Sequence, residues 1–293
     1  GASNVAVGNY ALDANTTAAN NVAIGYNALT ANTTGANNTA LGAAAGAANV
    51  DDTENVAIGY AANHPDGGSY VTAVGSQSLN ANTADSNSGI GYLALTANTT
   101  GTANTAVGRS SMAANTTASY GTAVGMTALA NNTTGASNTA VGYYALVTNT
   151  TGATNVAIGD QALEANTTGT SNVAVGSQAL EATTTTSNNT AVGKNALLVS
   201  TGTGNTAMGY TALDANTTGN YNVAIGFDTM GANTTGADNT AIGNSCLNSN
   251  TTASNNVAVG KAALAANTTG TSNVAVGTDA LDANTTADGN TAI

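Results

Sequence analysis

Residues 155–171 read N-V-A-I-G-D-Q-A-L-E-A-N-T-T-G-T-S, and residues 172–188 read N-V-A-V-G-S-Q-A-L-E-A-T-T-T-T-S-N. The pattern that these two stretches share, N-[VT]-A-[VI]-G-x-x-A-L-x-A-N-T-T-G-x-x, continues in both directions over all 293 residues. We number its positions 1 to 17, so that Asn155 occupies position 1 and Gly159 position 5. A short fixed period of this kind is typical of solenoid proteins.

The repeats follow one another at intervals of 17 residues, with three intervals of 16. Position 1 falls at Asn4, Asn21, Asn38, Asn55, Val71, Asn87, Asn104, Gly121, Asn138, Asn155, Asn172, Asn189, Asn205, Asn222, Asn239, Asn256, Asn273 and Asn290. No linker and no second pattern interrupts this register. We therefore predict that residues 1–293 form a single all-β domain, a parallel β-solenoid of about seventeen coils with one coil per repeat.

Positions 1 to 4 have the chemistry of a short β-strand. Position 2 is Val, Thr or Ser, and position 4 is always aliphatic, so we expect the position-4 side chains to be buried. Position 3 is Ala in every copy except Gly89, which predicts a close approach of neighbouring backbone. Position 5 is Gly in all seventeen complete copies, which predicts a corner with positive φ.

The second half of the repeat predicts a second short strand and a turn. The Ala-Leu pair at positions 8 and 9 suggests a strand over positions 7 to 9. The following A-N-T-T-G segment has turn chemistry, because Asn bonds to its own backbone. Its N-T-T triplets are also formal glycosylation acceptors. Asn at position 1, in sixteen of eighteen copies, predicts a ladder of stacked side chains.

The apolar content of the repeat suggests that one chain alone is not enough. Positions 3 and 4 point to opposite faces of one strand, yet both are restricted to apolar residues. One face can fill the interior of the coil, and the other needs a partner. Each coil also has few apolar side chains, so the free energy gained by burying them is small compared with the conformational entropy that seventeen ordered residues lose. We therefore expect a parallel homotrimer, with the Ala column where the chains approach.

The motifs N-V-A-I-G and N-T-A-V-G, followed by A-L and N-T-T-G, resemble the head repeats of trimeric autotransporter adhesins. They are also similar to tandem repeats of marine bacterial surface proteins and phage tail fibres. The resemblance covers essentially the whole chain, although the adhesin head repeat is shorter than 17 residues. It implies a homotrimeric extracellular fibre, on a cell surface or virion, that binds surfaces or presents a binding tip.

Composition excludes several classes of function. Three Lys and Arg residues stand against fifteen Asp and Glu residues, for a net charge of −12, which opposes binding to nucleic acid or to anionic membranes. No stretch is long and apolar enough for membrane insertion. A single His64 and a single Cys246 leave no catalytic pair, so we expect no enzyme. Cys246 stands where Ala stands in other repeats, so we expect it to be buried.

The most irregular turn contains the remaining candidate metal ligands. Asp51, Asp52 and Glu54 precede the segment N-H-P-D-G-G, which includes His64 and Asp66. We expect an exposed imidazole and a solvated charge cluster here, and no cofactor. The alternative is that the four carboxylates converge on Ca²⁺, which prefers several oxygen ligands.

Aromatic residues recur at position 6, directly after the corner glycine. They are Tyr26, Tyr60, Tyr92, Tyr143 and Tyr210, with Phe227 at the same position. One interpretation is aromatic packing over the corner. The other is a stripe that contacts surface glycans of a host or of the environment, because a Tyr ring offers an apolar face and a polar tip.

We conclude from the sequence that the chain is a fibre or adhesin segment, which acts as a rigid spacer and as a surface for attachment. Its first expected partner is a further copy of itself. An ice-binding solenoid is the alternative, because columns of Thr on a flat face can order water. Against that alternative, the paired Thr residues are adjacent within a turn, whereas an ice-binding face would need Thr-x-Thr on one strand.

Overall fold

The computed structural model describes residues 1–293 and confirms the predicted fold class. It is an all-β parallel solenoid of about seventeen coils without any helix. The chain divides into two compact units, Gly1–Thr151 and Gly152–Ile293.

Each coil contributes one strand, which spans positions 2 to 4 of the repeat. The first unit contains β1 (Val5–Val7), β2 (Val22–Ile24), β3 (Thr39–Leu41), β4 (Val56–Ile58), β5 (Thr72–Val74), β6 (Ser88–Ile90), β7 (Thr105–Val107), β8 (Thr122–Val124) and β9 (Thr139–Val141). The second unit contains β10 (Val156–Ile158), β11 (Val173–Val175), β12 (Thr190–Val192), β13 (Thr206–Met208), β14 (Val223–Ile225), β15 (Thr240–Ile242), β16 (Val257–Val259), β17 (Val274–Val276) and β18 (Thr291–Ala292).

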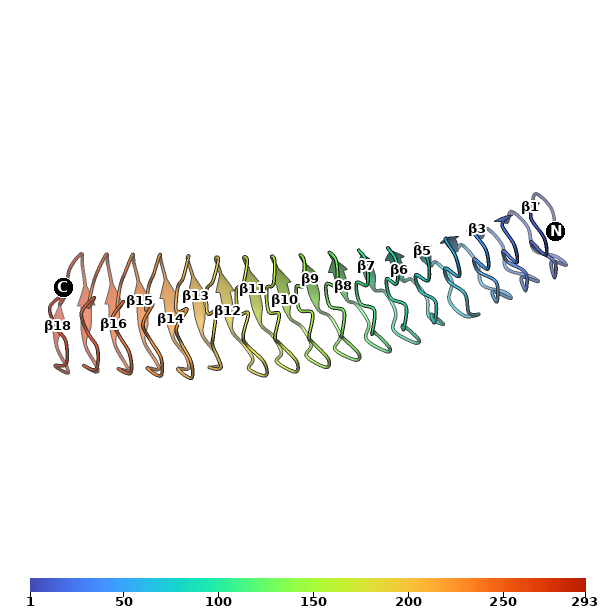
Figure 1. Cartoon of the computed structure of the whole chain (residues 1–293). Coiled ribbons are helices and arrows are strands. Elements are labelled where there is room, and N and C mark those ends of the chain that lie inside the picture. Colours follow the sequence, from blue (N-terminus) through green and yellow to red (C-terminus); the bar gives the residue numbers. More distant parts are fainter. The chain divides into compact units, whose positions relative to one another are not determined.

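Within each unit, successive strands pair in parallel and match position for position. Ala23 of β2 lies opposite Ala40 of β3, and Ala174 of β11 lies opposite Ala191 of β12. In Figure 1 the strand arrows of successive coils lie side by side along one face of each unit. Every repeat position therefore forms a column that runs through the coils of its unit.

The repeats of 16 residues keep this register. Ala57 pairs with Ala73 across the shortened repeat, as full repeats do. In the shortened repeat that starts at Val71, Asn82 Nδ2 donates to the carbonyl oxygen of Ala84, two residues further on, at 2.8 Å. The corresponding bond in full repeats spans three residues. The missing residue is therefore position 14, in the turn between the buried Asn of position 12 and the next strand.

Backbone hydrogen bonds between coils continue well beyond the strands. In the second coil, the Gly25 N–H donates to Val7 of the coil before, at 2.8 Å. Further along, the Leu29 N–H donates to Ala45 and the Thr33 N–H to Val50, both in the coil after, at 3.0 and 2.8 Å. The turns are thus bonded along the solenoid axis in the same way as the strands.

The predicted second strand at positions 7 to 9 is wrong, because this segment is a turn. Positions 7 and 9 adopt left-handed backbone conformations, with φ of 56° at Gln161 and 52° at Leu163. A left-handed conformation is unfavourable for Leu. It is tolerated here because it directs a fully buried side chain into the coil. A small residue followed by Leu is compatible with a strand as well as with this turn, so the sequence pattern alone does not distinguish the two structures.

The interior of the coil is lined by Ala at positions 3 and 8 and by Leu at position 9. Ala157, Ala162 and Leu163 have no exposed surface. The expected burial of position 4 is wrong, since Val124 and Ile158 are 37% and 39% exposed. The strand therefore presents its middle residue to the interior and its two flanking residues to the outside.

The narrow interior explains this orientation. At Gly89, the one position-3 residue without a side chain, an added Cβ would lie 2.6 Å from Ser78 Oγ and 3.2 Å from Leu79 Cγ. Even a methyl group would be crowded at Gly89, and in the neighbouring coils the space between the strand and the opposite wall is already filled by the buried Ala of position 3. The Ala column, which includes Ala157 and Ala174, is therefore the core of a single coil, and its predicted place between chains is also wrong.

The predicted glycine corner is confirmed. Gly159 has a φ of +137°, and a Cβ there would lie 2.5 Å from the carbonyl oxygen of Gly176 in the next coil. Both the backbone conformation and the close approach exclude a side chain.

The predicted Asn ladder at position 1 is also confirmed. Asn172 Oδ1 accepts from the Asn189 N–H at 3.0 Å, and Asn172 Nδ2 donates to the Thr186 carbonyl at 2.8 Å. A second ladder lies at position 12, where Asn115 Nδ2 donates to Asn98 Oδ1 at 2.7 Å. The sequence predicts only a turn at position 12, so this ladder is an addition that the structure makes.

We predict that enlarging the interior Ala column destabilises the solenoid. Ala40→Leu, at a fully buried position 3, should lower the melting temperature clearly, because overpacking costs about 1–3 kcal/mol or more. Ala43→Leu, three residues later at an exposed site, is the matched control and should change little. Thermal melts followed by circular dichroism measure both, and equal losses would contradict the assigned interior.

We also predict that the Asn ladder contributes more to stability than exposed Asn residues. Asn172→Ala should lower the free energy of unfolding by about 1–3 kcal/mol, because it removes the acceptor of the buried Asn189 N–H. Asn244→Ala, at an exposed position 6, should have little effect. Urea denaturation compares them, and an unchanged midpoint for Asn172→Ala would argue against the ladder.

Candidate functional site

The outer side of the strands forms a stripe of β-branched and aliphatic side chains. We call the residues at positions 2 and 4 of all strands the strand face. None of them is charged in any copy of the repeat. Leu41 and Ile90 on this face are 46% and 42% exposed. Exposed aliphatic side chains that recur in successive coils of each unit make this face a candidate site of interaction.

The position-6 aromatic side chains project into solvent. Tyr26, Tyr60, Tyr92, Tyr143 and Tyr210 are all about half exposed. Some of these rings pack against another ring, as the first interpretation expects, whereas others have a free face that could contact a glycan.

Three of these rings take part in aromatic pairs. Tyr210 and Phe227, in adjacent coils, stack with 5.5 Å between centroids and 11° between planes. The rings of Tyr143 and Tyr144 lie 4.2 Å apart, and Tyr10 contacts Tyr26 edge to face at 6.0 Å. Tyr60 and Tyr92 have no ring partner.

The candidate metal ligands mainly bond to the backbone of the irregular turn. Asp52 Oδ2 accepts from the Gly67 N–H at 2.7 Å, and Asp66 Oδ1 accepts from the Val50 N–H at 2.9 Å. Burial raises the pKa of Asp52, although the bond from Gly67 opposes this. Asp51, Glu54 and His64 are exposed. Nowhere in the chain do three or more His, Cys, Asp or Glu side chains lie in an arrangement that could hold a metal ion.

Cys246 is buried at position 8, as predicted. Its Sγ lies 3.1 Å from the Ala258 carbonyl oxygen and donates to it. Burial raises the pKa of the thiol to about 11. The side chain therefore replaces the buried Ala of other repeats and is held as the neutral thiol.

The N-T-T triplets are largely engaged in bonds within the solenoid. Asn98 of one triplet is fully buried, and its Nδ2 donates to the Gly101 carbonyl at 2.9 Å. Thr99 Oγ1 donates to the Thr116 carbonyl of the next coil at 2.9 Å, although Thr99 and Thr100 are both exposed. The side-chain amide of Asn98 is therefore inaccessible in the folded chain, while the two Thr residues of the triplet remain at the surface.

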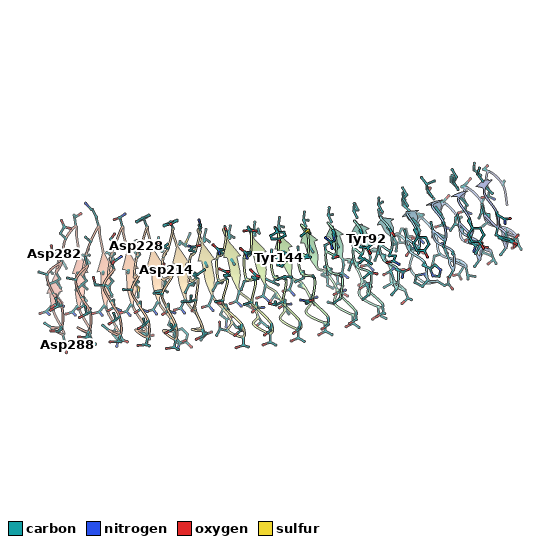
Figure 2. All side chains as sticks on the ribbon, viewed as in Figure 1. Tyr92, Tyr144, Asp214, Asp228, Asp282 and Asp288 are labelled. Carbon is teal, nitrogen blue, oxygen red and sulfur yellow. The ribbon has the colours of Figure 1, made fainter.

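Sequence reasoning missed an acidic edge on the second unit. It comprises the acidic residues at positions 6, 7 and 10 of this unit: Asp160, Glu164, Glu181, Asp214, Asp228, Asp279 and Asp282. These positions lie on the turn that follows the strand. Figure 2 shows Asp214, Asp228 and Asp282 beside the strands, while Asp288 lies at the far side of its coil. Sorting the acidic residues by repeat position would have revealed the edge.

Burial and repulsion between carboxylates raise the pKa of two side chains of the acidic edge, Glu181 and Asp214. Burial is the main cause at Glu181, with Glu164 adding to it, and a hydrogen bond from Gln178 Nε2 at 3.0 Å opposes the shift. At Asp214, burial again comes first, followed by repulsion from Asp228. Ionisation of Glu181 and Asp214 therefore opposes folding at neutral pH.

We predict that mild acid stabilises the chain. Because the folded pKa values of Glu181 and Asp214 lie above their ordinary values, their contribution to stability is greatest below the ordinary carboxyl pKa and falls as pH rises through the raised one. The melting temperature should be higher near pH 4 than near pH 7. Glu181→Gln should raise it at pH 7 and flatten the profile, whereas Asp238→Asn, at an exposed position 17, should do less. A melting temperature that falls steadily on acidification would contradict this.

No family model matches the chain, and no curated protein matches it. The structure also contains no helix that is long and apolar enough to cross a membrane. The surface features of the chain that bear on function are the uncharged strand face, the half-exposed aromatic residues at position 6 and the acidic edge.

Proposed function

We propose that the chain is a non-enzymatic segment of an extracellular fibre or adhesin, which acts as a stiff spacer and as a surface for attachment. The observation that carries this proposal is the repetition of one coil, bonded to its neighbours at every turn and strand. Each added repeat lengthens a solenoid by about 4.8 Å without changing its cross-section. Such a chain suits a role in spanning distance.

The side-chain chemistry supports a structural role. His64 is exposed in an irregular turn, and Cys246 is a buried thiol with its pKa raised to about 11. A nucleophile activated by a neighbouring base needs both groups within hydrogen-bond reach of each other. Cys246 instead donates to backbone carbonyl groups.

The strand face supports self-association as part of this function. We propose that further copies of the chain cover it, parallel and in register, in a homotrimer. A second copy has the same period, so its Val, Ile and Thr side chains meet equivalent rows in every coil. The absence of charge at positions 2 and 4 allows this face to be buried.

The extracellular location, on a cell surface or virion, is proposed from the resemblance to trimeric autotransporter adhesins and phage tail fibres. The scarcity of cations is compatible with it, since three Lys and Arg residues give little attraction to intracellular nucleic acid. The corrected orientation of the strand changes one part of the proposal. Chains would meet through positions 2 and 4, and the Ala column would remain inside each coil.

We predict that the chain is trimeric at micromolar concentration and that charges on the strand face dissociate it. Ile158→Glu combined with Val175→Glu places two carboxylates on neighbouring strands and should shift the mass to that of a monomer. Thr168→Glu combined with Thr269→Glu, at exposed positions 14, adds the same charge elsewhere and should leave the trimer intact. Light scattering and native mass measurement give the result.

A stable, cooperatively folded monomer of the unaltered chain would overturn the proposed self-association. Thermal hysteresis of the same preparation tests the ice-binding alternative. Substantial hysteresis would favour that alternative over the fibre, because the exposed strand face would then be the surface that orders water.

A further inference from the structure

Three position-6 tyrosines of the first unit occur in every second coil. Tyr26, Tyr60 and Tyr92 follow strands β2, β4 and β6, and they are 55%, 59% and 49% exposed. The coils between them carry small residues at the same position, Ala43 and Ser76. Two gaps therefore separate the three rings, one above Ala43 and one above Ser76.

The register of the sheet fixes the width of these gaps. Strands β2 to β6 pair position for position, so the three rings belong to one column. Coils about 4.8 Å apart place rings of alternate coils about 9.6 Å apart. The adjacent pair Tyr210 and Phe227 shows how position-6 rings align, nearly parallel and 5.5 Å apart.

A gap of this width accepts one further six-membered ring. A ring inserted halfway would lie about 4.8 Å from the ring on either side, within the 4.5–7 Å range of stacked rings. Tyr60 has an open gap on each side and no aromatic partner, so it would contribute a face to both sites. The Tyr210–Phe227 pair lacks such a gap, because its rings already stack on each other.

We propose that these gaps bind neutral pyranose rings, as the terminal or branching sugars of a surface polysaccharide. A pyranose presents apolar C–H faces to flanking aromatic rings and hydroxyl groups at its rim. Ser76 and Gln77, both half-buried, supply polar groups at the floor of the second gap. Ala43 and Ala44 give the first gap an apolar floor.

The negative charge of the chain favours neutral polysaccharides over anionic ones. Residues 21–103 contain no Lys or Arg, and the whole chain carries a net charge of −12. Uronic-acid and sulfated polymers would therefore be repelled, and a neutral glycan is favoured. The inserted ring lies parallel to the tyrosine rings, so its polymer crosses the column of rings instead of following it. Single-sugar branches meet this requirement best. This inference deepens the attachment role within the proposed function and rests on it.

The test is affinity electrophoresis of the folded chain in gels that contain soluble galactomannan, whose galactose branches are single and neutral. We expect retardation by galactomannan and none by alginate, an anionic polymer. Tyr60→Ala should weaken galactomannan binding about tenfold, because this ring lines both gaps. Tyr70→Ala, which removes an equally exposed tyrosine at position 17, should leave binding unchanged.

A variant with filled gaps distinguishes insertion of a sugar ring between the tyrosines from non-specific binding to exposed aromatic side chains. Ala43→Tyr combined with Ser76→Tyr adds two rings to the column and should abolish retardation, because each new ring occupies a gap. Stronger retardation of this variant, or none of the unaltered chain, would overturn the proposal. Circular dichroism melts of each variant establish that it is folded. Light scattering on the same samples measures self-association independently of sugar binding. A trimer that does not bind galactomannan would therefore refute only the proposed sugar sites.

Discussion

Hydrogen bonding along the solenoid axis is the interaction on which the rest of this structure depends. Strands only three residues long would not pair stably by themselves. Here the donors of the turns also bond to the next or preceding coil, and buried Asn side chains bond to backbone groups that the strands leave unpaired. The Asn189 N–H, for example, is satisfied by Asn172 Oδ1. A coil therefore gains its order from its neighbours, and the fold requires repetition.

The same dependence explains the composition. Because each coil must stack closely on the next, corner positions such as Gly159 exclude a side chain. Because the coil is narrow, its interior accepts a methyl group from the strand and one Leu from the opposite wall. Little room remains for large apolar residues inside, and the aromatic residues lie outside. The function must then come from what the outer columns present.

The sequence predicted the period, the corner glycine and the position-1 ladder, because each of these depends on one residue type at one position. The sequence also predicted that the position-4 side chains are buried, whereas it is the position-3 side chains that point into the coil. Positions 3 and 4 are both apolar, and hydrophobicity does not show that the space inside admits Ala157 but not Ile158. It also missed the left-handed turn at Leu163, because alternation of small and large residues fits a strand as well as a turn that reverses the chain.

The exposed surface was predictable in part. Recurring Tyr at position 6 indicated a column of rings, and the structure shows which of these rings stack and which have no ring partner. The gap between Tyr60 and Tyr92 depends on Ser76 in the coil between them, so it could have been found by reading down one column of the aligned repeats. The acidic edge needed the same reading. The raised pKa of Glu181 also depends on burial, which only the folded coil defines.

The repeats that lack position 14 have a consequence for how this architecture varies. Ala57 and Ala73 remain paired although the chain between them is one residue shorter, so the outer turn absorbs the change in length without disturbing the strands. Loops inserted at that turn would point away from the column of strands and recur at intervals of about 4.8 Å. The solenoid is thus suited to serve as a display scaffold, on which foreign peptides could be arrayed at defined spacing by lengthening chosen coils.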